Sequence, residues 1–329
     1  MSARRLTLAC QPYDRMQGLW EGTTPARGLD ITFLPLPIEE TFFRMARFRE
    51  FDAAEMSLST YVLTLPDGPF VAIPVFPSRV FRHSGIYVRA DSPLTDPAQL
   101  AGLTVGVPEY QITAAVWICG ILQDFYGVSV ASVRYRTGGL DQPGRIEKVA
   151  LDLPPDVDVA PIPPDETLSN MLLNGQLDAV YSARNPGPYN TGNHGGLRRL
   201  ITNSAAAERD YARKTGIFPI MHTLVLRRDV YADAPWIARE LLSACTASKN
   251  AAMKRFDETA ALNCMLPWSP DHADEARDLL GADWWPYGIA ANETTLSTFL
   301  RYSFEQGLAA KAYSPRELFA AETLEQHVV

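Results

Sequence analysis

Short apolar runs alternate with amphipathic stretches along most of the chain. The runs have the length of buried strands, and the stretches between them repeat apolar side chains at the three- and four-residue spacing of a helix. Strands that alternate with helices are typical of an α/β fold with mainly parallel sheets. The pattern predicts strands at 6–10, 29–36, 51–57, 70–76, 85–89, 104–107, 133–139, 177–182 and 222–229, and helices at 39–48, after 104–107 as far as about 126, and at 167–175, 206–216, 235–256 and 293–307.

Individual residues predict the ends of one of these helices and the buried face of another. Thr167 is a predicted N-cap, because its hydroxyl can accept a free N–H of the first turn. Gly175 is the predicted stop of the same helix, since glycine adopts the left-handed conformation that ends helices. In the helix at 39–48, Phe42 and Phe43 are expected on the buried face with Ala46.

Composition narrows the functional classes. The 329 residues carry a formal net charge of −8, whereas nucleic-acid binding requires a basic field. The four cysteines form no closely spaced pair, which predicts buried thiols in a reducing compartment. The proline-rich stretch 151–166 permits only short edge pieces of regular structure.

The N-terminus bears on the compartment. Arginines precede the apolar run LTLAC, but the distance from Arg5 to Gln11 is too short for the 7–15 apolar residues of a signal peptide. No stretch approaches the roughly 20 apolar residues of a membrane span. We therefore expect a soluble, cytoplasmic protein with neither a membrane nor nucleic acid as a partner.

Three segments resemble type II periplasmic binding proteins. QLAGLTVGV (99–107) is similar to their entry into the second lobe, NMLLNGQLDAVYS (170–182) to a helix-to-strand unit, and HTLVLRRD (222–229) to the strand that returns to the first lobe. The resemblance implies two α/β lobes with a ligand cleft between them. Lobe one would be 1–88 plus 223–329, and lobe two 89–222.

A closer resemblance covers nearly the whole chain. Its blocks are 51–60, 73–89 with FPSRVFRH, 106–117 with GVPEYQ, 138–149, 215–222 and 299–308. FPSRVFRH and GVPEYQ are long, contiguous and unusual in composition, and the blocks together resemble the 4,5-dihydroxyphthalate decarboxylase family. This resemblance implies non-oxidative removal of one carboxylate from a dihydroxylated aromatic diacid, giving protocatechuate from 4,5-dihydroxyphthalate.

The implied reaction sets chemical requirements. Direct loss of CO2 would leave a poorly stabilised aryl carbanion, whereas protonation of the ipso ring carbon avoids it. The site then needs a group for the phenolic proton, an acid for the ring carbon, and cations or N–H donors for the carboxylates. Two alternatives stay open: a non-catalytic binding protein or sensor for an aromatic carboxylate, and a thiamine-precursor type protein that shares only the fold.

Three residues are candidates for proton transfer. His83 and His222 titrate near neutral pH and lie where the chain is expected to cross between the lobes. Glu109 lies at the predicted start of a helix, where a carboxylate near a bound diacid would gain a raised pKa and could donate a proton. Their structural alternatives are buried histidines bonded to the backbone and a simple charge–dipole pairing of Glu109.

The remaining candidates would hold carboxylates or the ring. Arginine offers a planar fork matched to a carboxylate, and serine hydroxyls with free N–H groups at a helix start suit one as well. Surface ion pairs and ordinary helix capping are the alternatives. The predicted substrate-binding residues are Glu55, Ser57, Ser59, Arg79, Arg82, Tyr110, Gln111, Arg145 and Arg184.

No cofactor is expected from the sequence. It contains no metal-binding motif, no glycine-rich nucleotide loop and no lysine motif for pyridoxal phosphate. A divalent metal held in space by Glu55, His83 and Glu109 is left open. The aromatic stretch WWPYG (284–288) is interpreted as core or interface. A homo-oligomer is compatible with the sequence, which does not fix the oligomeric state.

Overall fold

The computed structural model describes residues 3–324, and these divide into two compact units. Unit 1 comprises 3–79, 220–296 and 314–324, and unit 2 comprises 80–219 and 297–313. The two-lobe α/β prediction is confirmed. The predicted boundaries differ. The segments 80–88 and 297–313 belong to unit 2, and 220–222 belongs to unit 1.

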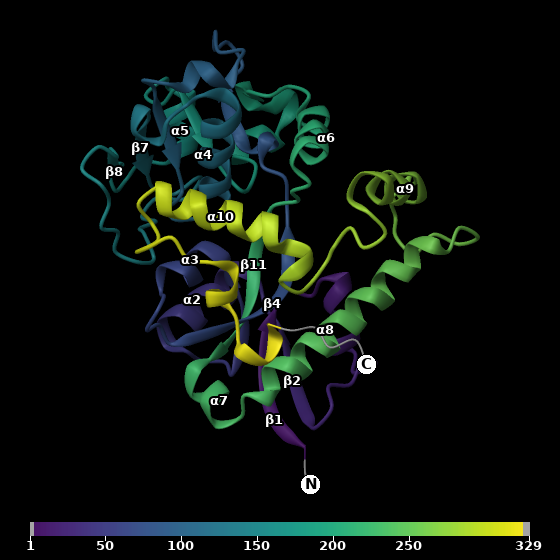
Figure 1. The fold of residues 1–329 in the computed structure, drawn as a ribbon. Helices are drawn as coiled ribbons and strands as arrows, with labels where there is room; N and C mark the ends of the chain where they lie inside the picture. The colour runs from purple at the N-terminus through teal and green to yellow at the C-terminus, as the bar shows by residue number, and fades with distance from the viewer. Residues whose placement is uncertain (1–2, 325–329) are drawn as a thin grey trace. The chain divides into compact units, whose positions relative to one another are not determined.

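Unit 1 is built on a five-stranded sheet in the order β2-β1-β3-β11-β4. Its strands are parallel except β11, which runs antiparallel to both of its neighbours. The amino end of β11 therefore lies at the same end of the sheet as the carboxyl ends of β1, β3 and β4 (Figure 1). The strands are β1 Arg4–Cys10, β2 Leu29–Pro35, β3 Ala53–Ser57, β4 Phe70–Arg79 and β11 Ile220–Arg227.

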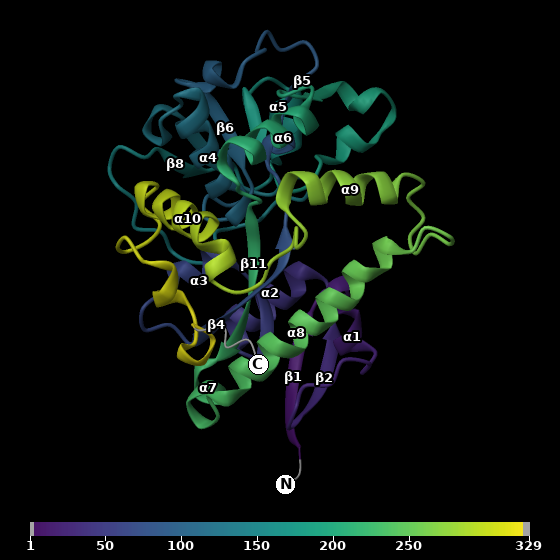
Figure 2. The ribbon, with the colours of Figure 1, turned by 45° about the vertical axis from the view of Figure 1, so that its right-hand side comes forward.

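Helices cover the unit 1 sheet. The longest, α8, packs against β4 and runs along the sheet in both views (Figures 1 and 2), while α2 and α3 pack on β3. In α2 the buried side chains are Thr41, Phe42 and Met45, whereas Phe43 is exposed, so the predicted buried face was wrong by one position there. The helices are α1 Gln17–Trp20, α2 Ile38–Phe48, α3 Leu58–Leu63, α7 Arg228–Asp233, α8 Trp236–Lys254 and α9 Ser269–Leu280.

Unit 2 contains a six-stranded sheet in the order β10-β5-β9-β6-β7-β8. The four strands from β9 to β8 are parallel, and β5 runs antiparallel to β9. The strand from the proline-rich stretch, β8, lies at an edge of the sheet as predicted. The strands are β5 Ile86–Arg89, β6 Thr104–Val107, β7 Arg134–Thr137, β8 Val159–Pro161, β9 Ala179–Tyr181 and β10 Leu197–Arg199.

Packing explains why 297–313 joins unit 2. In α10, Phe299 and Tyr302 contact Trp117 of the buried helix α4. A Cβ at Gly120 would collide with the ring of Tyr302, so the close approach of the two segments requires glycine there. Thr167 caps α5 as predicted. The helices are α4 Thr113–Tyr126, α5 Leu168–Leu173, α6 Ser204–Thr215 and α10 Glu293–Glu305, whose residues 297–305 belong to unit 2.

Two sequence predictions need correction. Cys10, Cys119 and Cys245 are buried, but Cys264 is exposed, so the four thiols are not all in the core. The helix α9 was not predicted, because its first turns carry mostly charged and small residues and show no clear apolar period. Within residues 3–324, no helix is long and apolar enough to cross a membrane.

Candidate functional site

Glu55 and His222 form a hydrogen-bonded pair on two neighbouring inner strands of the unit 1 sheet. They lie on the neighbouring strands β3 and β11, and His222 Nδ1 is 2.6 Å from Glu55 Oε1. The Glu55 side chain is fully buried, whereas that of His222 is 14% exposed. The ring of Phe42 packs edge-on against the imidazole with 4.9 Å between centroids. The pair therefore combines a buried carboxylate with a histidine that a ligand can reach.

Three further donors surround the Glu55 carboxylate. Oε2 accepts from Cys10 Sγ at 3.3 Å and from the backbone N–H of Gln11 at 3.2 Å, and Oε1 accepts from the Tyr13 hydroxyl at 2.8 Å. Burial opposes ionisation, but the hydrogen bond and charge of His222, with these donors, outweigh it and lower the pKa of Glu55. Because both oxygens already have protein partners, the geometry favours orientation of His222 over the predicted contact with substrate.

The other unit 1 candidates lie near the same end of the sheet. Ser57 is the register partner of His222 and caps α3 by accepting from the backbone N–H of Thr60. Ser59 is buried in the first turn of α3. Arg79, at the end of β4, donates to the carbonyl of Pro286 at 2.7 Å and to Asn292.

Burial also lowers the pKa of Arg79 to about 9. Arg79 is only 4% exposed, and its guanidinium donates hydrogen bonds to other residues of unit 1. These contacts favour a structural role for Arg79 over the predicted contact with a ligand carboxylate.

Two residues at this end of the sheet were missed by the sequence analysis. Tyr13 and Arg15 follow directly after β1, and the Tyr13 hydroxyl reaches Glu55. The signal was present, because the residues after the carboxyl end of a parallel strand are the usual ligand-facing positions of an α/β sheet.

Glu109 in unit 2 forms ion pairs with two cations. Its Oε1 is 2.7 Å from Arg145 Nη2 and 2.5 Å from Lys148 Nζ, and its side chain is 1% exposed. Glu109 lies in a turn, because α4 begins only at Thr113. The charge–dipole alternative is thereby replaced by two ion pairs. Arg145, predicted to hold a ligand carboxylate, holds this internal one.

Tyr110 and Gln111 are buried beside Glu109. The backbone N–H of Tyr110 donates to Glu147 Oε1 at 2.6 Å, and its hydroxyl donates to the carbonyl of Gln306 at 3.3 Å. Gln111 Nε2 donates to the carbonyl of Val149 at 3.4 Å. Burial raises the pKa of Glu147. Both predicted ligand contacts thus have internal partners in unit 2.

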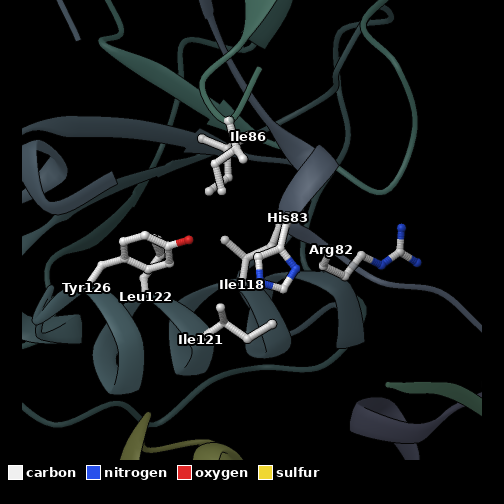
Figure 3. A pocket seen from close by; sticks show the side chains of 8 residues that line it. Arg82, His83, Ile86, Ile118, Ile121, Leu122 and Tyr126 are labelled. Carbon is white, nitrogen blue, oxygen red and sulfur yellow. The ribbon is translucent and has the colours of Figure 1, made fainter. Parts of the chain in front are cut away.

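His83 lines a small, largely apolar cavity of about 10 Å³ in unit 2, room for about one water molecule. Figure 3 shows its ring beside Ile118 while Arg82 extends away from the cavity. His83 is 4% exposed, and burial lowers its pKa to about 4. Within residues 3–324 its Nδ1 has no hydrogen-bond partner. These surroundings favour a packing role for His83 over the predicted proton transfer.

The two remaining arginine candidates lie near the same end of the unit 2 sheet. Arg82 donates to the carbonyl of Ala183 at 3.3 Å. Arg184 is exposed, and its backbone N–H donates to Ser182 Oγ at 3.1 Å. In the part of the chain that the structure describes, no group of three or more His, Cys, Asp or Glu side chains is placed to hold a metal ion.

Comparison with known proteins decides the family. The chain is 39% identical over 327 residues to the 4,5-dihydroxyphthalate decarboxylase of Comamonas testosteroni, covering 99% of both chains. The chain belongs to the 4,5-dihydroxyphthalate decarboxylase family. The Pseudomonas putida member of this family is 40% identical over 65% of the chain and 83% of its own length. The resemblance stated from the sequence is therefore confirmed. No protein-family model matches the chain.

Solved structures identify the fold of this decarboxylase family member. The aliphatic sulphonate-binding protein SsuA of Escherichia coli superposes with a TM-score of 0.52 at 13% identity, covering 99% of this chain and 100% of that one. A sulfonate-binding SsuA of Methylobacillus flagellatus gives a TM-score of 0.55 at 12% identity, covering 97% and 92%. This member of the decarboxylase family thus has the fold of periplasmic binding proteins.

Proposed function

We propose that this chain removes one carboxylate from 4,5-dihydroxyphthalate without oxidation and releases protocatechuate (3,4-dihydroxybenzoate) and CO2. The similarity over the whole chain to an enzyme named for this substrate supports the reaction. The Glu55–His222 pair supports the chemistry, and it is the observation on which the assignment of residues depends.

The chemistry begins with protonation of the ring. A proton adds to the carbon that bears the leaving carboxylate, while the hydroxyl para to that carbon gives up its proton and supplies electron density. The C–C bond to the carboxylate then breaks, its electron pair restores the aromatic ring, and the phenol regains its proton. In sum, a dianion takes up one proton and yields a monoanion and CO2.

His222 is the proposed proton donor. Its Nδ1 is directed to Glu55, so the other ring nitrogen, Nε2, is left for proton exchange with the substrate. The negative charge of Glu55 compensates the positive charge that His222 carries when it holds two protons. A carboxylate without solvent contact keeps this orientation fixed, which a proton donor requires.

The decisive experiment is direct. Purified protein is mixed with 4,5-dihydroxyphthalate, and CO2 and the ultraviolet spectrum of the product are followed. We expect release of one CO2 per substrate. Thermal stabilisation by the compound without CO2 would instead indicate the binding protein or sensor, which the sulphonate-binding fold would also accommodate.

A variant assigns the step to its residue. His222→Ala is expected to lower kcat by roughly 10²–10⁴, the usual contribution of a positioned acid or base. His272→Ala is the matched control, because His272 also lies in unit 1 but is 54% exposed, with only a distant acidic neighbour at 3.9 Å. Equal activity of both variants would contradict the role of His222.

A further inference from the structure

Arg15 is held rigidly near the carboxyl end of β1, in unit 1. Its guanidinium carbon lies 4.0 Å from the centre of the Tyr13 ring and 4.3 Å from that of Trp285, in the aromatic stretch 284–288. Its Nε donates to the carbonyl of Pro77 at 2.5 Å. Two cation–π contacts and a backbone acceptor fix both the plane and the direction of the fork.

Two independent contacts place Arg15 beside the Glu55–His222 pair. The Tyr13 ring that it stacks on carries the hydroxyl that donates to Glu55 Oε1, the oxygen that His222 also contacts. The carbonyl that it binds belongs to the residue before Ser78, which is the register partner of His222 on β4. All of these residues belong to unit 1.

The charge of Arg15 is only weakly compensated inside unit 1. Its Nη1 is 3.0 Å from Asp14, whose side chain is 54% exposed and therefore contributes a weak, solvent-screened pair. Within residues 3–324 its Nη2 has no partner. Arg79 differs, since it is buried with two internal acceptors. Arg15 is 16% exposed, so a small ligand can reach it.

We propose that Arg15 binds the carboxylate that the reaction retains. This rests on the proposed function. The leaving carboxylate must lose its charge to become CO2, so a guanidinium on it would stabilise the substrate more than the transition state. The retained carboxylate keeps its charge throughout, and a fork on it anchors the ring beside His222 without opposing bond breakage.

Calorimetric titration of the full chain with protocatechuate and with catechol tests this. Protocatechuate carries only the retained carboxylate, and catechol has the same hydroxyls and no carboxylate. Arg15→Met is expected to weaken protocatechuate binding by about 10- to 100-fold, the range for hydrogen bonds to a charged group, and to leave catechol within threefold. The KM for 4,5-dihydroxyphthalate should rise by a similar factor while kcat changes little.

Two further variants support the interpretation. Arg15→Lys keeps the charge but loses the fork, so intermediate affinity is expected. Arg277→Met is the matched control, because Arg277 also stacks on a tryptophan, Trp284, and pairs with an aspartate, Asp274, at 2.6 Å on α9. It should leave all affinities unchanged. Thermal unfolding verifies that each variant is folded.

Distinct results overturn the inference or the proposed function. Unchanged protocatechuate affinity in both Arg15 variants, or equal weakening of catechol, would overturn the role of Arg15. A loss for 4,5-dihydroxyphthalate alone would assign Arg15 to the leaving carboxylate and overturn the inference. If the wild type releases no CO2 but the protocatechuate and catechol titrations behave as expected, the proposed function fails and the carboxylate site at Arg15 stands.

Discussion

Replacing Glu55 with glutamine isolates the buried charge that orients His222. The carboxylate accepts from four donors, two on each oxygen, and its side chain is fully buried. An amide has one accepting oxygen and one NH2 group. Whichever way it is turned, its NH2 faces two donors of the original set. In both orientations the negative charge beside His222 is lost.

The magnitude follows from this count. Two donors lose their acceptor in an environment without water, and each unsatisfied donor costs about 1–3 kcal/mol. We expect Glu55→Gln to lower the free energy of unfolding at pH 7 by about 2–6 kcal/mol. The loss of the negative charge beside His222 should lower kcat by at least about 10²-fold.

Urea unfolding and steady-state turnover measure the two effects. The lowered pKa of Glu55 means that its ionised form stabilises the native state above the usual value of 4.5, and that this contribution is lost as the pH falls below it. The stability difference between wild type and variant should therefore shrink in acid. Glu50→Gln is the control, because Glu50 is an exposed partner of Arg44. If Glu55→Gln keeps kcat within threefold, the orienting role is refuted.

Three further outcomes are expected. Burial lowers the pKa of His83 from 6.5 to about 4, so between these pH values the unfolded chain binds a proton that the native state does not. About 3 kcal/mol of stability should therefore be lost as the pH falls from 6.5 to 4. In urea titrations His83→Leu should remove this pH dependence of stability, and it should keep kcat within tenfold. Glu109→Gln should lower the free energy of unfolding by about 1–3 kcal/mol, since Arg145 and Lys148 lose their shared carboxylate but remain partly exposed, and a kcat loss above 10²-fold would restore its predicted role as the acid. Incubation of the wild type with a chelator should leave turnover unchanged, and activity regained only on adding a divalent metal would contradict a cofactor-free reaction.

Local patterns determined much of the secondary structure. The apolar pattern predicted every strand of the unit 1 sheet and the inner strands of the unit 2 sheet, whereas the short edge strand β10 was not predicted. Thr167 was recognised as the cap of α5. The family resemblance added the two-unit division. The strands that carry Glu55 and His222, β3 and β11, were both predicted.

Only the tertiary structure decided what those side chains do. Arg79, Arg145 and Arg15 look alike in the sequence. The first binds internal carbonyl groups, the second binds Glu109, and the third stacks on two rings and pairs only with the exposed Asp14. These partners lie up to 270 positions away, as Trp285 does from Arg15. Sequence spacing reports which face of an element a residue occupies, whereas the charge and solvent contact that set its chemistry come from elements that only folding brings together.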